Sequence, residues 1–277
     1  MLRAPMHRRL ARWIAAPSLL LAACTTSTEP AKSDTGKAES KAKAETKAKA
    51  DAKQDAKRSD GKAVELEAPT TAVTPARPSG EPRSWSFDGE GKDAVAKGLR
   101  ISQSGEQVDP PATWAVVEVE DAPSPPHAFG VTKTVGTNKT FNLALIEDTR
   151  YADVDITVML KPLTGSNNQG GGVVFRAKGD NDYYVARWNP VETNFRLYAL
   201  IGGARVDLKS APLDLDVKQW HSLRVVAEGE HIECFVDDKP VVQADDKSLP
   251  DAGMVGLWTK GDAATLFDEL TITAPSH

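Results

Sequence analysis

The sequence is poor in cysteine, histidine and aromatic residues, and these shortages exclude several classes of protein. It has 2 cysteines and 5 histidines in 277 residues, and 6% of its residues are aromatic. Its cysteines, Cys24 and Cys234, are far apart, and no cysteine or histidine cluster has the spacing of a zinc site. The phosphate-binding motif GxxxxGK[ST] and the serine-hydrolase motif GxSxG are both missing. We therefore expect neither a zinc protein, nor a P-loop nucleotide-binding protein, nor a serine hydrolase.

The first 24 residues have the features of a bacterial lipoprotein leader. Four arginines lie between residues 3 and 12, and the apolar stretch at residues 13–23 is too short to span a bilayer. It ends in "LAAC", residues 21–24, which matches a lipobox. We therefore expect residues 1–23 to be a signal peptide and Cys24 to carry a lipid anchor. Thr25 after the cysteine favours the outer membrane. An ordinary export signal with a chance cysteine is the alternative.

The rest of the chain divides into a linker and one acidic domain. Residues 24–82 are rich in Ala, Lys and acidic residues and then in Pro, with no apolar stripe, which predicts a disordered tether. Residues 83–277 have the length of a single domain. This domain holds 19 Lys and Arg against 29 Asp and Glu, a net charge of −10. Such an acidic domain is not expected to bind nucleic acid, because phosphates require a basic patch.

Segments of alternating apolar and polar residues predict that the domain is all-β. They are separated by turn sequences such as "GDND", "NPVETN" and "IGGA", and no segment has an apolar stripe of three helical turns. The predicted strands are Thr113–Glu120, Thr140–Leu145, Tyr151–Leu160, Gly172–Ala177, Tyr183–Trp188, Phe195–Leu200, Ala204–Leu208, His221–Glu228, His231–Asp237, Lys239–Asp245, Met254–Thr259 and Ala264–Thr273. Many short strands at this spacing are typical of a sandwich or a barrel.

The segment "GGVVFRAKGDNDYYVARW", residues 171–188, has arginines on the face that is not apolar. If "GDND" is the turn of a hairpin, Arg176 lies opposite Val185 and shares a face with Tyr183 and Arg187. The other face is predicted to belong to the core, and it holds Val173, Phe175, Tyr184, Ala186 and Trp188.

The later strands show the same alternation. Arg224 and Glu233 alternate with apolar neighbours and are expected to point away from the core. We therefore predict a sheet with one apolar face and one face lined by arginines, tyrosines and a glutamate.

Four further segments indicate a family. They are "SWSFDGE" (84–90), "TWAVVEVED" (113–121), "WHSLRVVAEGEHIECFVDDKPVV" (220–242) and "GMVGLWTKGDAATLFDELTI" (253–272). Together with residues 171–188, they resemble the bacterial concanavalin A-like lectin and glucanase jelly rolls, in particular the 3-keto-disaccharide hydrolase family, also called domain of unknown function 1080. Laminin G-like modules are more distant relatives.

The resemblance implies a particular fold and a place for the ligand. It implies a two-sheet jelly-roll sandwich of about six or seven strands in each curved antiparallel sheet, with the ligand on a concave sheet face. It also implies a structural calcium ion at the edge, for which Asp88 and Asp268 are the candidate ligands. The alternative is that Asp268 only caps a turn, and no other cofactor is expected.

The polar sheet face supplies the candidate binding site. Arginine offers a rigid fork of donors to sugar hydroxyls, and tyrosine and tryptophan offer flat apolar faces. The candidate ligand-binding residues are Arg176, Tyr183, Arg187, Arg224, Glu233 and Trp258. The alternative is a solvated sheet face with cross-strand arginine–carboxylate pairs.

Catalysis is the less favoured interpretation, and the sequence leaves it open. Glycosidases need two carboxylates across the scissile bond, and the domain has no ExDxxE strand of the retaining-glucanase type. If a reaction occurs, Glu233 and Asp207 are the candidate carboxylates.

We interpret the protein as an envelope lipoprotein whose domain binds a carbohydrate without cleaving it. One alternative, implied by the resemblance, is a hydrolase or lyase of the 3-keto-disaccharide hydrolase type. Another is a structural or adhesive module that binds an envelope protein.

Overall fold

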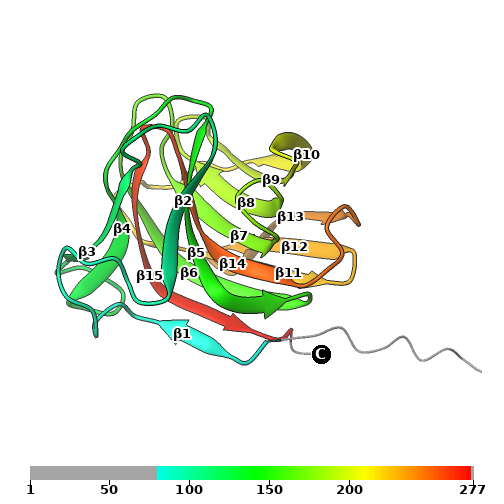
Figure 1. Ribbon diagram of the computed structural model, residues 1–277, viewed down its shortest axis with the longest axis horizontal. Coiled ribbons are helices and arrows are strands. Elements are labelled where there is room, and N and C mark those ends of the chain that lie inside the picture. Colours follow the sequence, from blue (N-terminus) through cyan, green and yellow to red (C-terminus); the bar gives the residue numbers. More distant parts are fainter. Residues whose placement is uncertain (1–79, 276–277) are drawn as a thin grey trace, which may run out of the picture. The chain divides into compact units, whose positions relative to one another are not determined.

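The computed structural model describes residues 80–275, which form fifteen strands and no helix in two antiparallel sheets (Figure 1). The all-β prediction is therefore confirmed. The predicted signal peptide, the predicted lipidation site Cys24 and nearly all of the predicted linker lie outside the described residues. Within residues 80–275, no helix has the length and apolarity needed to cross a membrane.

The first sheet, which we call sheet A, has eight strands. Seven follow the order β13-β12-β11-β6-β15-β4-β3, and β1 pairs with β15. The strands are β1 (Arg83–Trp85), β3 (Thr113–Glu118), β4 (His127–Lys133), β6 (Val154–Thr164), β11 (His221–Glu228), β12 (His231–Val236), β13 (Lys239–Asp245) and β15 (Ala264–Thr273).

The second sheet, sheet B, has seven strands in the order β10-β9-β8-β7-β14-β5-β2. They are β2 (Leu99–Gly105), β5 (Thr140–Tyr151), β7 (Gly171–Ala177), β8 (Tyr183–Asn189), β9 (Asn194–Ile201), β10 (Ala204–Pro212) and β14 (Gly253–Lys260). Each predicted strand corresponds to an observed one. The set of predicted strands lacked β1, β2 and β4.

The main core lies between the sheets and follows from the alternation in the sequence. In β11, every second residue is buried and the residues between are half-buried. The predicted core residues Phe175, Tyr184 and Trp188 of sheet B all belong to this cluster, as does the free thiol of Cys234 from sheet A. Burial in this core raises the pKa of Cys234, so the thiol is inert.

Sheet B is buried on its outer face as well. Every residue of β7 and β8 is buried, so these strands do not show the pattern of a half-solvated sheet. A second apolar cluster covers the outer face, and it consists of Leu143, Leu145, Val174, Ala177, Tyr183, Val185, Tyr198, Leu200, Met254 and Trp258. Long apolar runs are the expected sequence signal of strands that are buried on both faces.

Curvature of sheet B explains how its outer face is enclosed. β7 and β2 are separated by β14 and β5, which would place them about 14 Å apart in a flat sheet. Nevertheless Asp180, in the turn between β7 and β8, accepts hydrogen bonds from Arg100 (3.0 Å) and Ser102 (2.9 Å) of β2. The sheet therefore curls around its outer face, which is concave (Figure 1).

Candidate functional site

The β7–β8 hairpin has the predicted faces but a different register. Val174 lies opposite Val185, and Gly172 lies opposite Arg187. The predicted pairing of Arg176 with Val185 is therefore wrong by two residues. An even shift keeps every side chain on its predicted face, so Tyr183 and Arg187 do point to the outer face of sheet B.

Arg176 does not point to that face, which corrects the prediction. Its φ of 51° lies in the left-handed region, and the β7–β14 register shifts beside it. The side chain is fully buried, and its guanidinium donates to the carbonyls of Ala152 (2.6 Å) and Gly229 (2.7 Å). It also pairs with Asp153 at 3.6 Å. Arg176 is thus a structural group that joins turns at one end of the two sheets.

Arg224 and Glu233 lie on the other sheet, so the prediction of one shared polar face is wrong. Both belong to sheet A, in β11 and β12. Arg224 makes a double hydrogen bond with Asp155 (2.8 and 2.6 Å), and Glu233 lies 3.3 Å from His231. The first pair joins β6 and β11 and the second lies within β12, and both are typical of a solvated sheet face.

Tyr183 and Trp258 form the floor of the outer face of sheet B. Tyr183 is fully buried, and its hydroxyl lies 2.8 Å from that of Ser104. Trp258 is 2% exposed and packs against Phe141 and Tyr198. Neither ring therefore has a free face on which a sugar stacks. The ring of Phe141, in contrast, is only half-buried and stays partly accessible.

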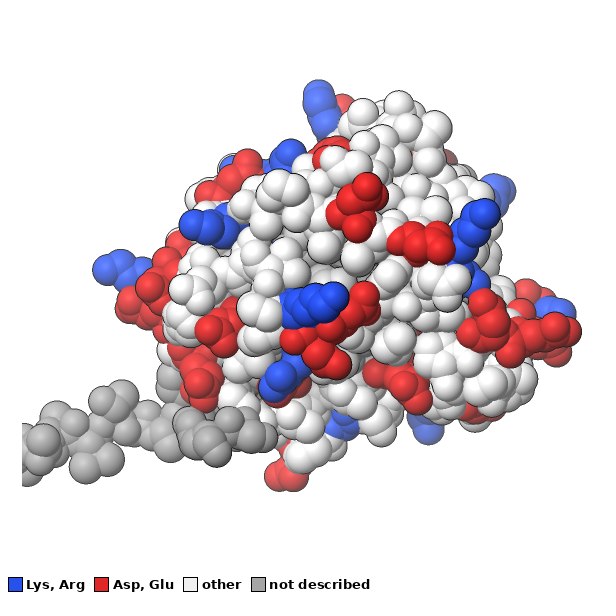
Figure 2. All heavy atoms as spheres, turned by 180° about the vertical axis from the view of Figure 1, so that it is seen from behind, with Lys and Arg blue, Asp and Glu red and all other residues white. Residues whose placement is uncertain are grey.

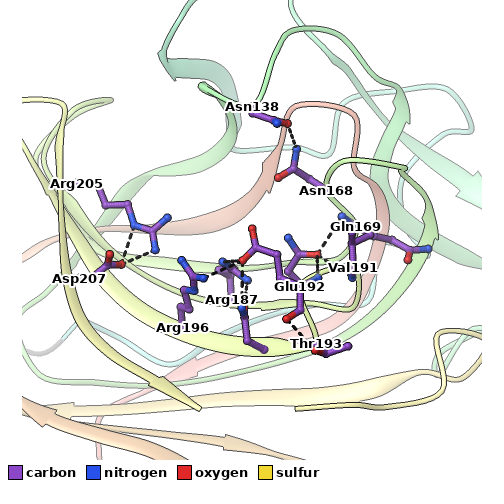
Figure 3. Close-up of polar contacts among 12 residues, drawn as sticks. Asn138, Asn168, Gln169, Arg187, Val191, Glu192, Thr193, Arg196, Arg205 and Asp207 are labelled. Atoms are coloured by element: carbon purple, nitrogen blue, oxygen red, sulfur yellow. Dashed lines mark hydrogen bonds and ion pairs between the residues drawn. The ribbon is translucent and has the colours of Figure 1, made fainter. Parts of the chain in front are cut away.

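Charged residues gather at one end of this outer face (Figure 3). We call Arg187, Arg196, Arg205 and Lys260 the cationic end. Arg187 comes from β8, Arg196 from β9, Arg205 from β10 and Lys260 from β14. Among these four, only Arg187 is a predicted ligand-binding residue.

A network of hydrogen bonds orders the cationic end. Arg187 donates to Asn194 (2.6 Å) and to Oε2 of Glu192 (2.9 Å), and Arg196 lies 3.2 Å from the same oxygen. Arg187 is 3% exposed and is held by these partners, whereas the Arg196 side chain is 31% exposed. Glu192 therefore fixes the two guanidiniums while leaving Arg196 open to solvent.

Arg205 is the second guanidinium that solvent reaches. It donates to Asp207 (2.8 Å) and lies 4.2 Å from the centre of the Tyr198 ring. A shallow hollow of about 270 Å³ on the same strands is lined by Arg196, Asp207 and Ser210 among others. Of the two guanidiniums that solvent reaches, that of Arg196 borders this depression on β9 and β10.

The two candidate catalytic carboxylates do not form a pair. Asp207 lies on sheet B beside Arg205, and Glu233 lies on sheet A. The second carboxylate of the cationic end is Glu192, which the sequence analysis did not select. Burial opposes its ionisation, but the hydrogen bond and charge of Arg187 outweigh burial and lower its pKa to about 2. A general acid requires the opposite shift.

The pKa of Glu192 predicts a stability change in acid. Its pKa is about 2 in the folded protein against an ordinary 4.5, so its contribution is complete above pH 4.5 and is lost as the pH falls to about 2. We expect Glu192→Gln to lower the urea midpoint more at about pH 5 than at about pH 3. An equal difference at both pH values would contradict the assignment.

The loops beside the cationic end are held rigidly. The carboxylate of Asp262 accepts the backbone N–H groups of Ser166, Asn167 and Asn168, each at 2.9 Å. Burial opposes ionisation of Asp262, but these hydrogen bonds lower its pKa well below the ordinary range. The amide of Asn168 also donates to Asn138 at 2.6 Å (Figure 3). These hydrogen bonds therefore hold the loops beside the cationic end in place before any ligand binds.

Asp88 and Asp268 meet, as the calcium prediction required. Ser124 donates its hydroxyl to Asp88 and its backbone N–H to Asp268, both at 2.8 Å. The second oxygen of Asp268 accepts the N–H of Glu269, and burial raises the pKa of Asp268 to about 6.

These two carboxylates are a poor fit for calcium as they stand. Both oxygens of Asp268 already accept hydrogen bonds, whereas calcium takes six to eight oxygen ligands. Residues 80–275 contain no group of three or more His, Cys, Asp or Glu that is placed to hold a metal. A calcium ion here stays a prediction.

One protein family and several solved structures are similar to this chain. The family profile described as "3-keto-alpha-glucoside-1,2-lyase-like domain" matches residues 85–273. The carbohydrate binding module CBM66 from Bacillus subtilis is 19% identical, with a TM-score of 0.47, over 60% of this chain and 98% of that one. A β-glucanase from Bacillus licheniformis is 12% identical, with a TM-score of 0.48, over 71% and 99%. No curated protein sequence matches the chain.

Proposed function

Because the chain belongs to the 3-keto-alpha-glucoside-1,2-lyase-like domain family, we propose that the outer face of sheet B binds a carbohydrate without cleaving it. The observation that carries this proposal is the pair of partly exposed guanidiniums of Arg196 and Arg205 on a concave face. Guanidinium forks donate hydrogen bonds in a fixed geometry, which suits vicinal sugar hydroxyls.

Binding is favoured over catalysis by the state of the carboxylates. Both Glu192 and Asp207 form ion pairs with arginines, at 2.9 Å from Arg187 and at a shorter distance from Arg205. An ionised, paired carboxylate neither donates a proton to a leaving group nor attacks a sugar readily.

The binding experiment uses the full chain in detergent on an array of neutral and acidic glycans. We expect Arg196→Gln and Arg205→Gln each to weaken binding about tenfold, the effect of losing a charge-assisted hydrogen bond. The control is Arg224→Gln, which removes a comparable arginine from sheet A. Binding that both sheet B variants leave unchanged would exclude this face.

A lyase is the second candidate, and the family favours it. Elimination next to a ketone needs a side chain that accepts the proton beside the carbonyl. Lys260 is the candidate base on this face, and burial lowers its pKa. Mass spectrometry of the glycans recovered from the array experiment distinguishes the two functions, because only a lyase leaves shortened products. A protein partner is the third candidate, for which free glycans would not compete.

We also propose that Cys24 anchors the protein in the outer membrane. The lipobox "LAAC" supports this proposal, because it places small residues directly before the cysteine. Incorporation of labelled fatty acid that persists in Cys24→Ser would refute it.

A further inference from the structure

The charges of the cationic end do not balance. Its four cations face two carboxylates, those of Glu192 and Asp207. Arg187 and Arg196 share one oxygen of Glu192, and Asp207 pairs with Arg205. Elsewhere, on the side of the molecule in Figure 2, acidic and basic side chains lie intermingled. The cationic end therefore has an excess of positive charge, although the net charge of the whole domain is −10.

Lys260 is the cation that the protein leaves without a partner. It is half-buried, and it makes no ion pair or side-chain hydrogen bond within residues 80–275. Burial lowers its pKa; the charge of Glu192 opposes this shift, and the three arginines of the cationic end add to it. A partly desolvated ammonium beside like charges is unfavourable unless an anion joins it.

An apolar ring lies next to this ammonium. Phe141 of β5 is the direct cross-strand partner of Lys260, so their Cβ atoms lie about 5 Å apart on the same face. The Phe141 ring packs on Trp258 with centroids 5.7 Å apart, and it remains half-buried. The site therefore offers a fixed aromatic surface and an unpaired positive charge side by side.

We propose that the cationic end binds a glycan whose pyranose rings carry an acidic group, a carboxylate or a sulfate. The sugar ring lies against Phe141, and its acidic oxygens lie between Lys260 and the exposed guanidiniums. This inference rests on the proposed function and names its ligand class. The acidic group supplies the negative charge that the cationic end lacks.

The experiment measures affinities of the full chain in detergent by calorimetry. Its probes are oligogalacturonate, the same oligomer after reduction of its carboxylates to alcohols, and a sulfated galactan oligomer. We expect at least one acidic oligomer to bind about tenfold tighter than the reduced, neutral one. Tighter binding of the uronate assigns the carboxylate, and tighter binding of the sulfated oligomer assigns the sulfate.

Two variants test the placement. Lys260→Met is expected to remove most of the tenfold preference for the acidic oligomer over the neutral one. Lys92→Met, which changes the net charge equally but lies outside sheet B beside Glu118, is the control and keeps the preference. Phe141→Ala is expected to weaken the binding of the acidic and the neutral oligomer to the same extent.

The outcomes separate this inference from the proposed function. Equal binding of acidic and neutral oligomers, or a preference that survives in Lys260→Met, overturns the acidic ligand class and leaves carbohydrate binding in place. Failure of every glycan to bind, both here and on the array, overturns both.

Discussion

Replacing Arg176 with methionine is expected to lower the free energy of unfolding by about 3–5 kcal/mol. Methionine fills a similar volume but donates no hydrogen bond, so the carbonyls of Ala152 and Gly229 lose their side-chain donor. Asp153 loses its cation as well. The large cost arises because these groups are buried or half-buried and cannot all turn to water. Urea unfolding followed by tryptophan fluorescence measures it.

Arg224→Met is the matched control for this substitution. Arg224 also makes a double hydrogen bond with an aspartate, but its side chain is 42% exposed on sheet A. Its loss is expected to change the free energy of unfolding by less than about 1 kcal/mol. Similar costs at the two arginines would show that burial of Arg176 does not decide its effect.

Gly172→Ala is expected to destabilise the protein by about 3 kcal/mol and to disturb the cationic end. A Cβ at Gly172 would lie 1.9 Å from the carbonyl oxygen of Ala186 and 2.7 Å from the Cα of Arg187. Because both atoms belong to the backbone of β8, the strand itself has to move. The cationic end moves with it, since Gly172 lies directly opposite Arg187. Thermal unfolding and glycan affinity measure the two effects.

Gly179→Ala separates crowding from the general effect of replacing a glycine. A Cβ at Gly179, in the turn after β7, would meet no atom within 4 Å. Its effect is expected to stay within about 1 kcal/mol, because only the conformational freedom of the unfolded chain changes. A Gly172→Ala variant as stable as Gly179→Ala would show that β8 accommodates the methyl group.

The sequence predicts the strands and their faces well because alternation depends on local geometry. Phe175, Tyr184 and Trp188 enter the main core as their spacing requires, even though the hairpin register is shifted. A shift by two residues changes each cross-strand partner but no face. The resemblance adds that the strands form two sheets, but it does not assign each strand to its sheet.

Alternation along one strand cannot say which sheet the strand joins. Arg224 and Arg187 both alternate with apolar residues in their strands, yet Arg224 lies on sheet A and Arg187 on sheet B. Arg176 fails for another reason, because the left-handed residue and the register shift at the end of β7 interrupt the period of two. The residues "FRAKG" (175–179) carry no sequence signal for the left-handed residue or the register shift.

The cationic end could be found only in part. Arg196 alternates with apolar neighbours in the same way as Arg187, so its direction was predictable. Glu192 lies in the turn "NPVETN", where an acidic residue usually signals turn geometry. Lys260 ends β14 and meets Phe141 only through the pairing of β14 with β5, which are far apart in the sequence.

The two apolar clusters on opposite faces of sheet B affect the entropic penalty of ligand binding. Strands packed on both sides open rarely, so their amides should exchange slowly with solvent. A ligand therefore meets a surface whose conformational entropy was already lost during folding. Only the outermost side chains, such as that of Lys260, remain to be immobilised, which keeps the entropic penalty of association small.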